Sequence, residues 1–372
     1  MADARQGINF LREKEHMDQD NWKTLPIVDS HLDLAENFTL FGYDLTRSVE
    51  ERRMIENRTR QQATVSLPEM SRGGIAVACA TVTPGFLVED VGEEFEPKSA
   101  LYRTAEEAEA QALKQFDLYE RWEQEGRVRL LKSRADLEDH LRLWQGDRKP
   151  GLVLLMEGAD PIVQVSDLPQ WWQRGLRMIG MTYGDTKYGA GVAGGHLGFK
   201  QAGLTPDGFA LLERMAEIGF IWDISHLTEA GMWQGLEMGF RRVCASHANA
   251  QSITPTSRHL SDDMIRAVAG QGGVIGLVLY NAFLEPRWRK DKRIVVTVEE
   301  HLRKHAEHIA SLVGWGHVGI GSDLDGGLGL EESPQEINTI ADLYKVGQVV
   351  PEHARAAVLS KNWLRFLRSA LP

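Results

Sequence analysis

The stretch GFIWDISH, residues 219–226, shows the pattern that decides the fold, a short apolar run that ends in polar residues. Residues 241–247, RRVCASH, repeat the pattern in the next part of the chain and also end in Ser-His. Six more runs share this character, at residues 25–33, 74–83, 151–157, 177–183, 273–279 and 317–323. Short runs that are apolar almost throughout are typical of parallel strands buried on both faces. The sequence therefore predicts eight parallel strands.

Helical patterns fill the gaps between these runs, at residues 105–127, 206–218, 262–269, 298–312 and 351–367. Thr205 and Ser261 stand where the N-caps of two of these helices are expected. Strands that alternate with helices define the α/β class. We expect a (β/α)8 TIM-like barrel, formed by residues 1–372 as a single domain with helical insertions and C-terminal helices. An open, doubly wound sheet is the alternative, but only a barrel brings all strand ends to one mouth.

Composition and charge exclude several classes of protein. The chain has 372 residues, and its 42 Lys and Arg against 53 Asp and Glu give a net charge of −11, opposite in sign to most nucleic-acid binders. No stretch is apolar over the ~18 residues of a membrane span, and the first residues lack the apolar segment of a signal peptide. Two cysteines cannot form a disulfide framework. We expect a cytoplasmic protein with no nucleic-acid or membrane partner.

Side chains that bind metals stand at the ends of five of the predicted strands. His31 and Asp33 are two residues apart, which places both on one face of a strand. Each donor alone also has a structural explanation, but together they form one rim of six: His31, Asp33, Glu157, His226, His247 and Asp323. Nitrogen and carboxylate donors without thiolates suit zinc, and other divalent metals are compatible. The set is too large for one catalytic zinc ion and suits two metals that share a carboxylate.

The same stretches resemble the membrane (renal) dipeptidases, a branch of the amidohydrolase superfamily. The resemblance extends over nearly the whole chain and follows the family's order. The matching stretches are VDSHLD at 28–33, LPEMSRGGIAV at 67–77, LLMEGADP at 154–161, IWDISH at 221–226, SHANAQSITPTSRHLSDDM at 246–264 and GSDLDGG at 321–327.

The resemblance implies a ligand set for two zinc ions. His31, Asp33 and Glu157 would bind one ion. Glu157, His226 and His247 would bind the other, so that Glu157 bridges the two. Asp323 is the one carboxylate at the mouth that this assignment leaves over, and we expect it to act as general base and then as general acid. Asp325, two residues later, is expected only to cap its turn.

Two further residues would contact the substrate. The family has an arginine eleven residues after the last metal histidine, where this chain has Arg258, and a guanidinium suits a bidentate grip on a carboxylate. The family often has a histidine at the end of the fourth strand, and this chain has Tyr183 there instead. A phenol can also donate a hydrogen bond to a carbonyl oxygen, but the change leaves the substrate profile open.

The resemblance thus implies a zinc-dependent dipeptidase that hydrolyses short peptides and tolerates a D-residue at the C-terminal position. Its partner would be a small peptide substrate, and a homodimer is compatible with this interpretation. The alternative within the superfamily is an activity on N-acyl amino acids or lactones. A barrel without activity would be expected to have lost a ligand or Asp323, and this sequence has lost neither.

Overall fold

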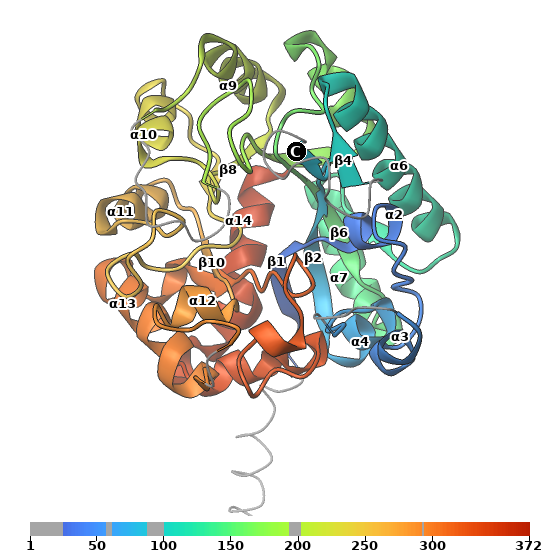
Figure 1. Cartoon of the computed structure of the whole chain (residues 1–372), viewed down its shortest axis with the longest axis vertical. Coiled ribbons are helices and arrows are strands. Elements are labelled where there is room, and N and C mark those ends of the chain that lie inside the picture. The colour runs from blue at the N-terminus through green and yellow to red at the C-terminus, as the bar shows by residue number, and fades with distance from the viewer. Residues whose placement is uncertain (1–24, 57–61, 88–99, 193–201, 292–293) are drawn as a thin grey trace, which may run out of the picture.

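The computed structural model describes residues 25–56, 62–87, 100–192, 202–291 and 294–372. Eight parallel strands form a central ring with helices around it (Figure 1). Their bounds are β1 (Ile27–Leu32), β2 (Ile75–Val82), β6 (Gly151–Glu157), β7 (Leu176–Gly180), β8 (Ile221–Asp223), β9 (Val243–Cys244), β10 (Ile275–Leu277) and β11 (Val318–Ile320). The first strand pairs with both β2 and β11, and a parallel bridge from Ala245 to Ile275 joins β9 to β10. The predicted barrel is confirmed, with one strand in each predicted run except that β7 starts one residue earlier.

Helices cover the outside of the ring. Their bounds are α2 (Leu34–Thr39), α3 (Val49–Ile55), α4 (Leu67–Arg72), α6 (Ala105–Gln124), α7 (Arg134–Asp147), α8 (Leu168–Arg174), α9 (Pro206–Ile218), α10 (Glu229–Glu237), α11 (Asp262–Gly270), α12 (Asn281–Leu284), α13 (Arg303–Val313) and α14 (Asn362–Ala370). Both predicted N-caps are confirmed, because Thr205 and Ser261 accept hydrogen bonds from the backbone of Gly208 and Met264. The predicted helical segments contain α6, α9, α11, α13 and α14 or most of them. The sequence did not predict the other helices, of which α7 is the longest, nor a small sheet of β3 (Phe86–Leu87) and β4 (Leu101–Tyr102).

Side chains of β6 alternate between the inside and the outside of the barrel, as the period of a strand requires. Val153 and Leu155 belong to an inner cluster that includes Trp363 of α14, while Leu154 and Met156 pack in the outer cluster. The same alternation puts Glu157, the last residue of β6, on the inside. A carboxylate therefore stands at the carboxyl end of the barrel, above an apolar interior.

The opposite end of the barrel is filled. A Cβ on Gly319, at the start of β11, would lie 2.2 Å from Nε1 of Trp363, so the indole ring packs directly on that strand. Trp363 has no exposed surface, and Phe366 and Leu367 of the same helix join the inner cluster. In the part of the chain that the structure describes, the carboxyl ends of the strands thus remain open for a site. Within the described residues, no helix combines the length and the apolar character needed to cross a membrane.

Candidate metal centre

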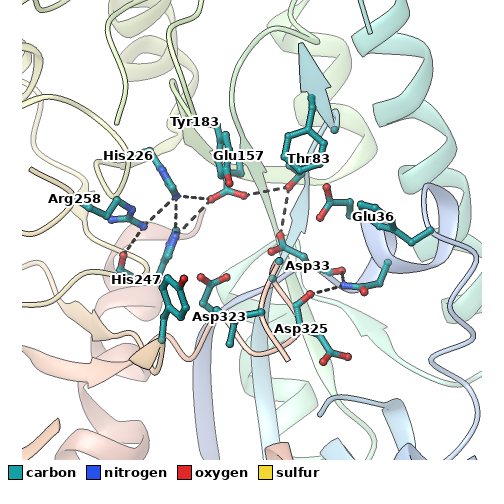
Figure 2. Close-up of a pocket in the computed structure, with 18 of the residues that line it drawn as sticks. Asp33, Glu36, Thr83, Glu157, Tyr183, His226, His247, Arg258, Asp323 and Asp325 are labelled. Carbon is teal, nitrogen blue, oxygen red and sulfur yellow. Dashed lines mark hydrogen bonds and ion pairs between the residues drawn. The ribbon is translucent and has the colours of Figure 1, made fainter. Parts of the chain in front are cut away.

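Three histidines converge on one carboxylate at the carboxyl end of the barrel. The Nε2 atoms of His31, His226 and His247 lie 3.3, 3.1 and 3.6 Å from Oε1 of Glu157 (Figure 2 shows the last two histidines). All four side chains are buried, with at most 7% of each residue exposed. The sequence prediction that these strand ends meet is therefore confirmed. Their role as metal ligands stays a prediction.

Hydrogen bonds fix the orientation of each imidazole ring. Nδ1 of His31 and Nδ1 of His247 lie 3.0 and 2.9 Å from the same hydroxyl, that of Ser246. The Ser246 hydroxyl donates its own hydrogen to Asp223, so both ring nitrogens must donate to it. Nδ1 of His226 donates to the carbonyl of Val192 over 2.9 Å. The tautomer follows from these bonds, and each Nε2 turns a lone pair toward the centre.

Asp33 and Asp323 complete the centre from the other side. Hydroxyls of Thr81 and Thr83 donate to Asp33 and hold its carboxylate in place. One ligand atom each from His31, Asp33 and Asp323 lies within 4.8 Å of the others, and the same holds for His31, Glu157 and His247. The described donors thus form two overlapping groups that share His31. Asp323 belongs to one of them, although the sequence pattern assigns it to proton transfer.

The charge balance of this centre calls for cations. Burial lowers the pKa of His31, but Glu157 and Asp33 outweigh burial and raise it to about 10. Burial also raises the pKa of Asp323 well above its ordinary value, and Asp33 and Glu157 add to the effect. Nε2 of His31 is buried without a hydrogen-bond partner. Without a metal ion these carboxylates favour a proton on Nε2 of His31, and a divalent metal ion, which suits carboxylate and imidazole donors, would take the place of that proton.

Ser246→Ala is expected to weaken metal binding by about 10- to 100-fold, the usual effect of removing a group that orients metal ligands. The substitution removes the shared acceptor of His31 and His247, so both rings lose their fixed tilt and tautomer. The measurement is competition for the metal with a chelator of known affinity.

Ser30→Ala is the matched control, because Ser30 is also a buried barrel serine but donates only to the carbonyls of Ser246 and Ile320. The control should keep the affinity of the parent within a few-fold. Equal affinities in the parent and Ser246→Ala would show that the shared hydroxyl does not set the metal site.

A cavity of about 480 Å³ lies above this centre, and Arg258 and Tyr183 form part of its wall. The guanidinium of Arg258 donates to the carbonyls of Ser225 and His247, and its Nη2 lies 3.0 Å from Nε2 of His226. Nε of Arg258 has no partner. The lone pair on Nε2 of His226 can bind only one partner at a time. A metal ion bound there would displace the Nη2–H of Arg258, and this N–H would join the Nε–H as a free donor for a substrate.

The phenol ring of Tyr183 lies beside the centre, with its centroid 4.7 Å from that of His226. Burial raises the pKa of Tyr183, so the hydroxyl stays protonated and can act as a hydrogen-bond donor. The structure therefore places Tyr183 and Arg258 in the same cavity as the candidate ligands, as the sequence predicted.

Asp325 has a role beyond the local one expected from the sequence. Its backbone has a positive φ of 64° in the turn after β11, and its carboxylate reaches distant parts of the chain. The carboxylate accepts bonds of 2.8 Å from the amide and the hydroxyl of Thr64, and it pairs with Arg52 at 3.1 Å. Arg52 and Thr64 lie more than 250 residues away in the chain, so no local pattern could show this anchor.

Sequence analysis also missed a buried acid in the cavity. Glu36 of α2 lines the cavity together with Asp33, Glu157 and Asp323. Burial and these three neighbours hold the pKa of Glu36 well above its ordinary value. The sequence did not mark Glu36 as a residue of the site, because a glutamate in the first turn of a helix is common.

A parallel barrel with a nitrogen and carboxylate cluster at its carboxyl end is the arrangement expected of a metal-dependent enzyme. The family model "Membrane dipeptidase (Peptidase family M19)" matches residues 18–371. The chain belongs to this family, as the resemblance of its motifs implied. The prediction of a metal-dependent peptide hydrolase that acts on dipeptides is thereby confirmed.

Individual proteins are also similar to this chain in sequence or in fold. An uncharacterized Klebsiella pneumoniae protein from the pqqA 5′ region is 29% identical over 66% of this chain and 89% of its own length. The dipeptidase verJ of Clonostachys rogersoniana is 27% identical over 61% of this chain and 58% of its own. A metallo peptidase of Rhodobacter sphaeroides, solved with a phosphinate mimic of the dipeptide L-Ala-D-Ala, superimposes with a TM-score of 0.76. That structure is 23% identical and covers 93% of this chain and 99% of its own, so it shows a common fold.

Proposed function

We propose that this protein is a dipeptidase that binds two divalent metal ions, with zinc as the preferred metal, in a single barrel domain. His31, Asp33 and Glu157 would hold one ion, and Glu157, His226 and His247 the other. The observation that carries the proposal is the convergence of three Nε2 atoms on one oxygen of Glu157, beside a buried arginine. Family membership and the orphaned Nε2 of His31 support it.

Arg258 would bind the C-terminal carboxylate of the substrate. Its guanidinium is already held by two backbone carbonyls, so little side-chain freedom is lost when a substrate binds. The fixed carboxylate then sets the register of the peptide, and only short peptides place their scissile bond over the metal centre. Recognition of the C-terminal residue through its carboxylate supports tolerance of a D-residue there.

Two bound divalent ions would acidify a water molecule so that it supplies hydroxide near neutral pH. Asp323 would accept the proton that this water gives up and deliver it to the amine nitrogen of the leaving amino acid. Tyr183 would donate a hydrogen bond to the oxygen of the scissile carbonyl, where negative charge develops. The positions of both groups in the cavity wall support these roles.

Arg258→Ala is expected to lower kcat/KM for a free dipeptide by about ten- to over a hundredfold. A hydrogen bond to a charged group contributes about 1.5–3 kcal/mol, which converts to this range. Steady-state kinetics on the free dipeptide and on its C-terminal amide measure the effect. The amide should be a poor substrate for the parent and should lose little more in the variant.

Arg258→Lys serves as the matched control, since it keeps the charge but loses the planar fork, and it should recover only part of the loss. If the parent hydrolysed the amide and the free dipeptide equally well, Arg258 would not bind a carboxylate. The activity would then belong to a neighbouring class of substrates, such as N-acyl amino acids or lactones.

A further inference from the structure

Glu36 presents a carboxylate to the cavity with nothing bound to it. Only 7% of the residue is exposed, and it lines the same cavity as the metal centre. Its carboxylate points into the space beside Asp33 and Thr83 (Figure 2). Among the residues that the structure describes, its side chain makes no hydrogen bond and no ion pair.

Other buried carboxylates of this barrel have partners. Asp29 accepts from Ser322, Asp223 accepts from Ser225 and Ser246, and Asp325 pairs with Arg52. A buried carboxylate without a partner is unfavourable, and folding alone gives no reason to keep one. Asp33, Glu157 and Asp323 act unfavourably on a charge at Glu36, and His31 only partly opposes them. Bound metal ions would offset the nearby negative charges but would give Glu36 no hydrogen-bond donor, and a cationic group of the ligand would supply one.

A basic and an acidic side chain face the cavity from opposite sides of the candidate metal ligands (Figure 2). Arg258 and Glu36 stand on opposite sides of Glu157 in Figure 2, with the candidate metal ligands between them. A free dipeptide has the same distribution of charge, because its carboxylate and its ammonium flank the peptide bond. The α-amino group has a pKa of about 7.7–8.0, so it is mostly cationic at neutral pH.

We propose that Glu36 is a specificity-determining residue that accepts a hydrogen bond from an ammonium group on the N-terminal residue of the substrate. The ammonium is either the α-amino group or a basic side chain of that residue. The inference rests on the proposed function, since it assumes that Arg258 receives the carboxylate. Together the two residues would contact a charged group at each end of the substrate, and they would disfavour N-acylated amino acids that carry no basic side chain.

The test uses calorimetry to measure the affinity of three probes for the metal-loaded parent and for metal-loaded Glu36→Gln. The probes are a phosphinate mimic of L-Ala-D-Ala, its N-acetylated form, and an N-acetylated form with lysine as the first residue. We expect Glu36→Gln to weaken binding of an ammonium-bearing probe by about ten- to a hundredfold. If only the first probe loses affinity, the group that Glu36 binds is the α-amino group. If only the third probe loses affinity, the group is the basic side chain. The N-acetylated alanine probe should bind both proteins equally.

An equal change for all three probes, or no change, would overturn the proposal. Glu36→Gln should unfold at or above the temperature of the parent, because it removes a buried charge and breaks no bond. Glu36→Asp gives an independent answer, since it keeps the charge but withdraws it by one methylene group, and it should show a smaller loss for the same probe. Hydrolysis of L-Ala-D-Ala by the parent tests the proposed function separately. Failure there would overturn the proposed tolerance of a D-residue, while the binding data would still decide the role of Glu36.

Discussion

Asp323→Asn is expected to lower kcat by about 10²–10⁴-fold while the metal content stays at two ions per chain. This range is typical for the loss of a general acid or base. The residue follows β11 in a turn with a positive φ of 60°, and its amide donates to the carbonyl of His31 over 3.3 Å. That backbone geometry aims the carboxylate at the centre. Asparagine tolerates the same φ and keeps the shape, but it cannot take up a proton.

The measurement combines kcat with metal analysis of the dialysed variant. Asp325→Asn is the control from the same turn, and it should lower thermal stability through loss of the Arg52 pair, with kcat of the folded fraction within a few-fold of the parent. Because Asp323 also lies within 4.8 Å of ligand atoms of His31 and Asp33, a second outcome is informative. If Asp323→Asn loses a metal ion, Asp323 is a ligand and the proton passes through another group.

Glu157→Gln is expected to abolish binuclear occupancy and to lower turnover by at least about 10²-fold. Oε1 of Glu157 faces all three imidazoles, so both ions would depend on its charge. Glutamine keeps the shape and one carbonyl oxygen, but it is a neutral and poorer ligand. A metal ion contributes several kcal/mol to the stabilisation of transition-state charge, which accounts for the loss of rate.

Metal content after dialysis, measured together with kcat, tests this expectation. Glu36→Gln is the matched control, because it makes the same chemical change in the same cavity but lies outside both ligand groups. The control should retain both ions. A Glu157→Gln protein that also retains both would place Glu157 outside the metal centre.

The parts of the fold that follow local rules could be predicted from the sequence. A short apolar run in the sequence predicts each buried strand, and closure of the barrel then brings the last residues of all strands together. Such reasoning located Glu157 at the end of β6 and the two Ser-His pairs after β8 and β9. The caps Thr205 and Ser261 were predictable for the same reason, since a cap acts within three residues.

The parts that depend on distant partners could not be predicted. Ser246 lies 215 residues from His31 in the chain, so the hydroxyl that joins the two halves of the centre becomes visible only in three dimensions. The pairing of Asp325 with Arg52 spans 273 residues, and an acid in a glycine-rich turn suggested only a local cap. Glu36 could not be predicted for a different reason. It is distinguished by the absence of a side-chain partner among the described residues, and a sequence does not show such an absence.

Trp363 and its helix have a consequence for the order in which the molecule is made. The end of the barrel opposite the metal centre is covered by α14, residues 362–370, which leaves the ribosome after all eight strands. The first strand likewise waits for the last, since Ser30 of β1 donates to the carbonyl of Ile320 across 290 residues. Contacts between such distant parts of a chain form slowly. A nascent chain therefore cannot close its metal centre before residues 318–320 and 362–370 have been made.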